Sequence, residues 1–299
     1  MTEPILVTGA TGNTGVSVVA GLRDRGDAVR AATRRPDPGD ADAVRFDWFD
    51  PSTFAAALAG VRAIYLVAPA GVADPAPVVR PFLEQAAAGG VADPAPVVRP
   101  FLEQAAAGGV RRVVALSSSA VARGEPLLGE IHALVVDLFS ESTVLRPSWF
   151  MQNFTADHAL AEGIRRSREI VTATGDGRLG FIDAADIAAV AVEALVADRP
   201  VGDELVLTGP EALSYGHAAA IISDVLGTPV RHVDVTTAQL ADRLTRAGLT
   251  GEFAAGLAAL DERIRAGEQD LVTTTVYDVT GRRPTSLREF LTVHRARLA

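Results

Sequence analysis

Three glycines near the N-terminus have the spacing of a phosphate-binding turn. Gly9, Gly12 and Gly15 stand in VTGATGNTG, after a strand-like apolar stretch and before a helix-like one. Glycine lets the backbone approach a phosphate closely, and a helix N-terminus offers free N–H groups and partial positive charge. The pattern predicts a dinucleotide site, with an ordinary glycine-rich turn as the alternative. The residues expected to hold the cofactor here are Gly9, Thr11, Gly12, Asn13, Thr14 and Gly15.

Two arginines follow the second strand-like stretch. AVRAATRRP ends in Thr33, Arg34 and Arg35, without the acidic residue that usually binds the ribose 2′-hydroxyl of NAD. Arginine suits a 2′-phosphate through charge-assisted hydrogen bonds, so the pattern favours NADP(H) over NAD(H). The alternative is a pair of solvated surface residues. Asp47, after the third strand-like stretch, is expected either near the adenine or as a turn residue before Pro51.

An aromatic segment offers material for a substrate pocket. LRPSWFMQNF places Trp149, Phe150, Met151 and Phe154 close together. Such side chains would form an apolar wall suited to a flat, aromatic or conjugated small molecule. The alternative is ordinary packing between two lobes.

The elements that must position these residues alternate between strand and helix. This alternation, with apolar strands, predicts a Rossmann-like doubly wound parallel sheet covered by helices on both faces. The expected strands lie within 4–9, 28–34, 43–46, 63–69, 111–118 and 142–149, and the expected helices within 13–26, 51–60 and 126–141.

The pattern loosens after residue 150. We expect a cofactor-binding domain over 1–150 and a smaller α/β substrate lobe over 151–299, partly interleaved with it. The lobe should lie at the carboxyl edge of the sheet, where substrates bind in such folds. Its expected strands lie within 169–175 and 204–209, and its expected helices within 186–198, 215–227 and 252–267.

One segment occurs twice, letter for letter. GVADPAPVVRPFLEQAAAG fills residues 71–89 and again 90–108. Each copy reads as a crossover helix between the fourth and fifth strands, where one helix suffices. The copies therefore compete for one groove on the sheet. We expect the first copy to dock, because the fourth strand then keeps its usual exit, and a docked second copy is the alternative.

Composition narrows the function classes. The net charge is −9 with no basic cluster, which disfavours nucleic acid as a partner. No apolar run could span a membrane, and no signal peptide is expected, so we expect a cytoplasmic protein. The chain has no cysteine and no lysine, which excludes thiolate metal sites, a cysteine nucleophile and Schiff-base chemistry. We expect no metal site and regard a homodimer as possible.

Several of these stretches together resemble a known family. GATGNTG, the arginine pair, YLVAP, VVALSSSA, LRPSWFMQNF and FIDAADIAAVAVEAL are similar to the NmrA-like branch of atypical short-chain dehydrogenases. That branch includes NAD(P)H azoreductases, quinone oxidoreductases, ergot-alkaloid iminium reductases and redox-sensing regulators. The resemblance runs from residue 4 to VTGRRPTSLREFL near the C-terminus. It implies an NADP-type cofactor, with Ala68 and Pro69 of YLVAP beside it, and a C-terminal substrate lobe.

The sequence departs from typical short-chain dehydrogenases in its catalytic pair. Those enzymes use a tyrosine and a lysine four residues later, and this chain has no lysine. Ser119 matches the family serine in SSSA and is a candidate to hydrogen-bond a substrate oxygen. His132, near the position of the missing lysine, is a candidate to orient the ribose or donate a proton. The alternatives are a strand-end serine and a packing histidine, and His158 is a weaker candidate for the pocket.

Hydride transfer needs no side-chain acid, because the cofactor carries the difficult chemistry. The sequence therefore favours an NADPH-dependent reductase of a small conjugated electrophile such as a quinone, azo compound, enone or iminium ion. Two alternatives stay open: a non-catalytic NADP(H)-sensing regulator, and a redox-neutral isomerase or cyclase. Asp183 and Asp186 in FIDAAD are expected to cap a helix.

Overall fold

A single parallel sheet organises the N-terminal half of the chain. In the computed structural model, which describes residues 3–69 and 94–298, seven parallel strands pair in the order β3-β2-β1-β4-β5-β6-β9. These strands are β1 (Ile5–Val7), β2 (Val29–Thr33), β3 (Ala43–Arg45), β4 (Ala63–Leu66), β5 (Arg112–Leu116), β6 (Glu141–Pro147) and β9 (Glu204–Leu207). The order reverses between β1 and β4, so the predicted doubly wound sheet is confirmed, with its switch point at the glycine-rich turn.

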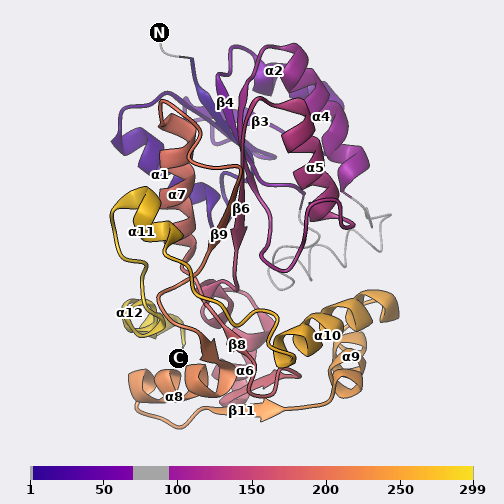
Figure 1. Cartoon of the computed structure of the whole chain (residues 1–299), viewed down its shortest axis with the longest axis vertical. Coiled ribbons are helices and arrows are strands. Elements are labelled where there is room, and N and C mark those ends of the chain that lie inside the picture. The colour runs from indigo at the N-terminus through magenta and orange to yellow at the C-terminus, as the bar shows by residue number, and fades with distance from the viewer. Residues whose placement is uncertain (1–2, 70–93, 299) are drawn as a thin grey trace.

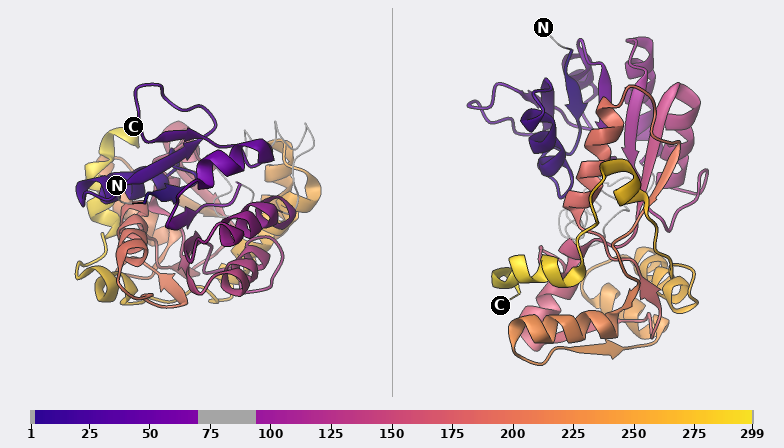
Figure 2. Two further views of the ribbon diagram at one scale, coloured as in Figure 1. Left: turned by 90° about the horizontal axis from the view of Figure 1, so that it is seen from above. Right: turned by 60° about the vertical axis from the view of Figure 1, so that its left-hand side comes forward.

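Helices cover both faces of this sheet (Figures 1 and 2). One face carries α1 (Gly15–Asp24), α7 (Ala184–Val196) and α11 (Thr275–Thr280), and the other carries α2 (Phe54–Leu58), α4 (Ala95–Ala107) and α5 (Leu128–Leu138). Each face of the sheet has its own hydrophobic core, and alternate strand residues pack in one core or the other, because successive side chains point to opposite faces. Tyr65 and Val114 lie in the core under α1 and α7, whereas Ile64 and Val113 lie in the core under α4 and α5.

The chain after residue 150 builds a second lobe but also returns to the sheet. Helix α7 packs against α1 on one face of the sheet. Strand β9 pairs with β6 at the edge of the sheet, with Leu207 opposite Pro147. The lobe has a core of its own that includes Met151, Phe154 and Tyr215. Its elements are α6 (Ala159–Ser167), β7 (Glu169–Thr172), β8 (Arg178–Leu179), β10 (Leu213–Ser214), α8 (Tyr215–Leu226), β11 (Arg231–Asp234), α9 (Thr237–Arg246), α10 (Gly251–Arg265) and α12 (Leu287–Val293). Short 3-10 helices cover Pro51–Thr53, Met151–Phe154 and Arg295–Arg297.

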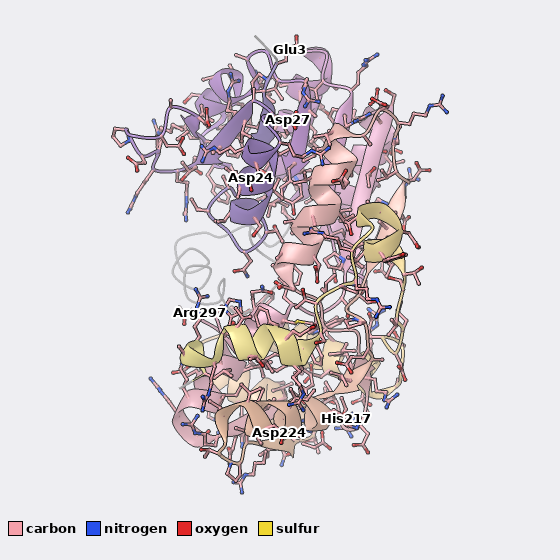
Figure 3. All side chains as sticks on the ribbon, turned by 90° about the vertical axis from the view of Figure 1, so that its left-hand side faces the viewer. Glu3, Asp24, Asp27, His217, Asp224 and Arg297 are labelled. Carbon is pink, nitrogen blue, oxygen red and sulfur yellow. The ribbon has the colours of Figure 1, made fainter. Side chains whose placement is uncertain are left out.

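The two lobes lie end to end along the long axis of the molecule. Figure 3 shows Asp24 and Asp27 of the α1 region toward one end, and His217 and Asp224 of α8 at the other. Among the described residues, no helix combines the length and the apolar character needed to cross a membrane.

Helix α10 connects the second lobe to the sheet. Asp261 accepts a hydrogen bond from the Ala173 N–H at 2.7 Å, and burial raises the pKa of this carboxyl to about 6. Arg265 donates to the Ala173 carbonyl at 2.8 Å and to Asp234 at 2.6 Å. At the same end of α10, Arg263 donates to the Ala120 carbonyl beyond β5 at 3.0 Å. The end of α10 is therefore fixed against both lobes.

The crossover helix α4 belongs to the second copy of the duplicated segment. Val98, Phe101, Leu102 and Ala105 of this copy are fully buried against the sheet and its neighbours. The centroid of the Phe101 ring lies 5.1 Å from that of Trp48 and 5.3 Å from those of Phe46 and Phe54. Each such aromatic pair contributes about 0.5–1.5 kcal/mol beyond the burial of its surface.

The prediction that the first copy docks is therefore wrong, and residues 71–89 lie outside the described residues. Helix α4 is joined to β5 by residues 108–111 alone, and the Val110 N–H bonds back to the Ala105 carbonyl. The docked helix α4 and the paired strand β5 are thus consecutive elements joined by a short connection. Both copies carry the same apolar side chains, so hydrophobic pattern does not distinguish them.

We predict that one copy is sufficient for the fold. Deleting 71–89 or 90–108 gives the same shortened chain, because the two copies are identical. That chain keeps every side chain that α4 buries, so its unfolding should stay cooperative, with a Tm within a few degrees of the parent. Circular dichroism during thermal unfolding measures this. A loss of cooperative unfolding in the shortened chain would show that the fold requires both copies.

Candidate cofactor and active site

The glycine-rich turn joins β1 to α1 with almost no free space. Gly9 has φ +62°, a conformation that favours glycine, and a Cβ there would lie 3.1 Å from the Cβ of Val67. A Cβ on Gly15 would lie 2.0 Å from the Gly9 carbonyl oxygen, an impossible contact. Glycine at these two positions is therefore required by the fold of the turn itself.

The turn presents backbone donors without protein acceptors. Within residues 3–69 and 94–298, no acceptor takes the N–H groups of Thr11, Asn13, Thr14 or Gly15, whereas the Gly12 N–H bonds the Gly9 carbonyl at 2.9 Å. The residues Thr11, Gly12 and Asn13 are exposed. Free N–H groups at the start of α1 form the arrangement that binds a diphosphate. The turn thus fits a dinucleotide cofactor.

Two side chains brace this turn from beneath, and sequence reasoning did not find them. The Thr8 hydroxyl donates to the carbonyls of Tyr65 and Val67 at 3.1 Å and accepts the Val67 N–H at 2.7 Å. The Tyr65 hydroxyl donates to Thr14 Oγ1 at 3.0 Å. Burial raises the pKa of Tyr65 far above its usual value, so the phenol stays protonated as a donor. The strand β4 thereby fixes the loop that follows β1.

Arg34 and Arg35 lie exposed just after β2. Neither guanidinium has an ion pair or a hydrogen bond with the described part of the chain, although other arginines of this domain do. Arg23 binds Asp40 at 2.8 Å, and Arg62 binds Asp27 at 2.8 Å. The two guanidinium groups beyond β2 are therefore available for an anion from solution.

The other residues expected near the cofactor lie at the same edge. Asp47 Oδ1 accepts the Phe49 N–H at 3.0 Å, as the turn-residue alternative describes, and its role toward adenine stays a prediction. Ala68 and Pro69 are half-buried just after β4. Their backbone continues from Val67, the residue that contacts the glycine-rich turn.

Ser119 lies beyond the carboxyl end of β5. Its N–H bonds the Pro147 carbonyl at 2.9 Å, and its hydroxyl donates to Gln269 Oε1 at 2.9 Å. Gln269 follows α10 and was not expected from sequence, because 150 residues separate it from its partner. The serine that the family comparison singled out is thus held by a side chain of the second lobe.

An arginine and a glutamate hold the backbone of the serine stretch. Arg146 of β6 donates to the carbonyls of Ser118 and Ser119 at 3.3 and 3.2 Å. Its remaining nitrogen binds Glu204 of β9 at 2.7 Å. This chain of contacts connects β9 to the loop after β5 and fixes where Ser119 stands.

His132 lies behind this ion pair on α5. Its side chain has no exposed surface, and neither ring nitrogen has a hydrogen bond, although Nε2 comes within 3.4 Å of Glu204. Burial lowers the pKa of His132, an effect that Glu204 partly opposes, so the ring is neutral near pH 7. In this conformation the ring reaches no solvent, and the prediction that it orients the ribose or donates a proton gains no support.

The aromatic segment divides between core and surface. Phe150, Met151 and Phe154 are buried, with at most 6% of their surface exposed, whereas Trp149 is half-buried. Phe150 packs in the core under α1 and α7, whereas Met151 and Phe154 pack in the core of the second lobe. Trp149 alone keeps a surface that a substrate can contact, and the role of the others in a substrate wall stays a prediction.

Other polar candidates have local structural partners. The His158 ring caps α6 by accepting the Leu160 N–H, and burial lowers the pKa of this ring to about 3. Asp183 caps α7 by accepting the Ala185 N–H at 3.0 Å, as predicted. Asp186 instead accepts the Thr285 N–H at 2.7 Å, which ties the C-terminal segment to α7.

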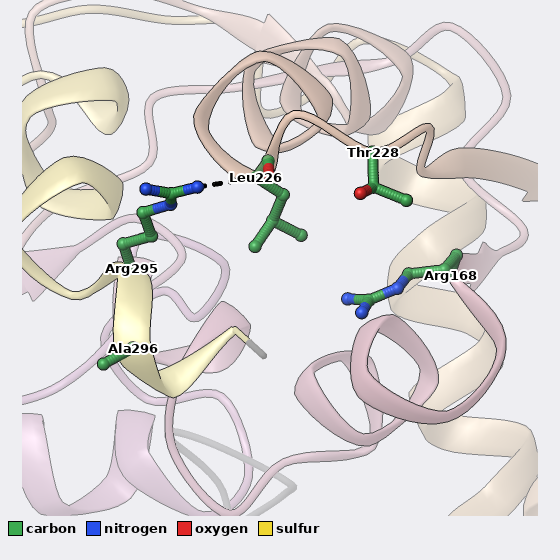
Figure 4. Close-up of a pocket in the computed structure, with 5 residues that line it drawn as sticks. All are labelled: Arg168, Leu226, Thr228, Arg295 and Ala296. Atoms are coloured by element: carbon green, nitrogen blue, oxygen red, sulfur yellow. Dashed lines mark hydrogen bonds between the residues drawn. The ribbon is translucent and has the colours of Figure 1, made fainter.

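A pocket of about 510 Å³ lies in the second lobe (Figure 4). It is lined by Arg168, Leu226, Thr228, Arg295 and Ala296. Arg295 donates to the Leu226 carbonyl, and Arg168 donates to the carbonyls of Ile164 and Leu298. These arginines stabilise chain ends of the lobe, so the pocket is not part of the cofactor site.

The sheet order, the glycine-rich turn and the free donors at the start of α1 define a dinucleotide-binding α/β protein. A family model described as NAD(P)H-binding matches residues 9–198. The chain belongs to this family, within the NmrA-like group of atypical short-chain dehydrogenases, and is an NAD(P)H-dependent oxidoreductase.

Similar proteins share nearly the full length of the chain. The uncharacterized oxidoreductase YesF of Bacillus subtilis is 43% identical over 98% of this chain and 96% of its own length. An agroclavine dehydrogenase of Claviceps fusiformis is 35% identical over 96% of both chains. Among solved structures, the NADPH complex of the quinone oxidoreductase QOR2 of Escherichia coli has a TM-score of 0.75 at 24% identity, covering 97% of this chain and 99% of that one. This last likeness shows the fold.

The brace under the turn yields a prediction. Tyr65→Phe removes the donor to Thr14 and should lower the free energy of unfolding by about 0.5–1.5 kcal/mol. It should also weaken binding of the cofactor, because the loop loses its support from β4. Urea unfolding and NADPH fluorescence titration measure the two effects. Tyr277→Phe, at a tyrosine that is 55% exposed, is the matched control and should change neither. Equal effects of the two variants would contradict the bracing role.

Proposed function

We propose that the protein is an NADPH-dependent reductase of a small, conjugated electrophile: a quinone, azo compound, enone or iminium ion. The observation that carries this proposal is a glycine-rich turn with free N–H donors next to the carboxyl end of β5, where the described residues place a serine and an amide. The names of the relatives support it, because they include dehydrogenases and a quinone oxidoreductase.

The chain's own residues have separate tasks in this proposal. The free N–H groups of the glycine-rich turn bind the diphosphate; these are the groups of Thr11, Asn13, Thr14 and Gly15. Arg34 and Arg35 bind the 2′-phosphate. When bound, NADPH supplies the hydride. Ser119 and the half-buried Trp149 face the substrate, one as a hydrogen-bonding group and the other as an apolar surface.

The tyrosines of the chain support transfer without a side-chain acid. Tyr65 is buried under the glycine-rich turn, Tyr215 packs against Phe181 in the second lobe, and Tyr277 lies on α11. None lies in α5, the helix that follows β5, and the sequence has no lysine to lower the pKa of a phenol. Substrates that accept hydride readily and take their proton from water suit such a site.

Oxidation of NADPH with a panel of acceptors tests the function. The panel contains a benzoquinone, an azo dye, a cyclic enone and a cyclic iminium ion, each assayed by loss of absorbance at the wavelength of the reduced nicotinamide. At least one acceptor should give turnover that saturates with substrate. Tight binding of NADPH without turnover of any acceptor would contradict the proposal and favour a sensing role.

Arg34 and Arg35, which have no side-chain partner within the described part of the chain, predict a preference for NADPH. Replacing Arg34 and Arg35 together by alanine should raise the Kd of NADPH at least tenfold and leave that of NADH nearly unchanged, because only NADPH carries the 2′-phosphate. Isothermal titration measures both constants. Arg45→Ala is the matched control. Arg45 is the last residue of β3, the strand that pairs with β2, and its guanidinium already binds Asp50 at 3.3 Å. An equal loss for both cofactors would contradict the assignment.

A further inference from the structure

Gln269 is a buried polar side chain at the edge of the proposed active site. Only 5% of its surface is exposed, and its Oε1 accepts the Ser119 hydroxyl at 2.9 Å. The cofactor cradle and the carboxyl end of β5 lie at the same edge of the parallel sheet, next to the switch point. The second lobe thus contributes this amide where a substrate would meet the cofactor.

The loop that carries Ser119, the partner of this amide, is fixed from both sides. On the sheet side, Arg146 holds the carbonyls of Ser118 and Ser119. On the other side, Arg263 donates to the Ala120 carbonyl from the last turn of α10. The hydrogen bond to Ser119 anchors the Gln269 amide to this fixed loop, and a side chain anchored in this way binds a ligand atom at reduced conformational cost.

The Nε2 end of the amide has no acceptor within the described part of the chain. With Oε1 bonded to Ser119, the Nε2 group carries two N–H donors. Nε2 is not among the described side-chain atoms that are both fully buried and without a partner, so it keeps some accessible surface although the residue as a whole is buried. An acceptor atom on a bound small molecule can therefore reach this donor.

We propose that Gln269 donates a hydrogen bond from Nε2 to the carbonyl oxygen of the substrate and thereby selects quinones and enones over iminium ions. This inference rests on the proposed reductase function. Hydride added to an enone carbon breaks the C=C π bond, and the electron pair moves to oxygen as an enolate. Hydride added to a quinone likewise leaves a hydroquinone monoanion.

The amide stabilises that oxyanion without losing a proton, and water then protonates the product. NADPH becomes NADP⁺ in the same step, so atoms and electrons balance. An iminium ion behaves differently, because hydride addition to C=N⁺ gives a neutral amine and no oxyanion forms. A fixed N–H donor therefore assists the first class of substrate and not the second.

Gln269→Leu tests this inference through its dependence on substrate. The variant should lose about 10²–10³-fold in kcat with a quinone or an enone, as for removal of one oxyanion donor, and stay close to the wild-type rate with an iminium ion. Gln104→Leu, at an exposed glutamine of α4, is the matched control and should leave all rates unchanged. An equal loss with every substrate would overturn the inference and leave Gln269 a structural role.

A spectroscopic experiment tests Gln269 without turnover. In the NADP⁺-loaded protein, bound 4-nitrophenol should ionise at a lower pH in the wild type than in Gln269→Leu, read from the absorbance of the phenolate. The same ionisation in both proteins would overturn the inference. If the wild type reduces none of the acceptors but still shows this difference, the proposed reductase function fails while the donor role of Gln269 stands.

Discussion

The contact between the backbone at Gly9 and Gly15 is the constraint on which the cofactor half of the structure depends. The Gly9 carbonyl oxygen occupies the place where any side chain at residue 15 would begin. This contact lets α1 start directly under the turn, with its free N–H groups facing outward. The strand β4 reinforces the arrangement through Thr8, Tyr65 and Val67. The dinucleotide cradle is therefore a property of three neighbouring elements.

Much of this architecture could be predicted from the sequence. The apolar strands and the Gly9–Gly12–Gly15 spacing are local patterns, and local patterns identify elements and the switch point of a parallel sheet. Gln269 could not be found in this way, because it lies 150 positions along the chain from Ser119 and meets it only in the folded protein. The apolar sequence around Tyr65 predicts a core strand residue, and no residue near it in the sequence predicts the hydrogen bond to Thr14.

The duplicated segment shows the same limit in another form. Two identical sequences have identical propensities, so only their connection to the sheet can distinguish them. The second copy continues into β5 through residues 108–111, and its Phe101 completes an aromatic cluster with side chains of the α2 region.

The proposed function requires direct hydride transfer at a site without a tyrosine–lysine pair. Single-turnover oxidation of NADPH deuterated at C4, with the two epimers compared on the most reactive acceptor, distinguishes this transfer from other routes. We expect a primary kinetic isotope effect with one epimer and none with the other, because a cofactor held in the cradle would present one face of its nicotinamide. The absence of an isotope effect with both epimers, while NADPH is still oxidised, would contradict it.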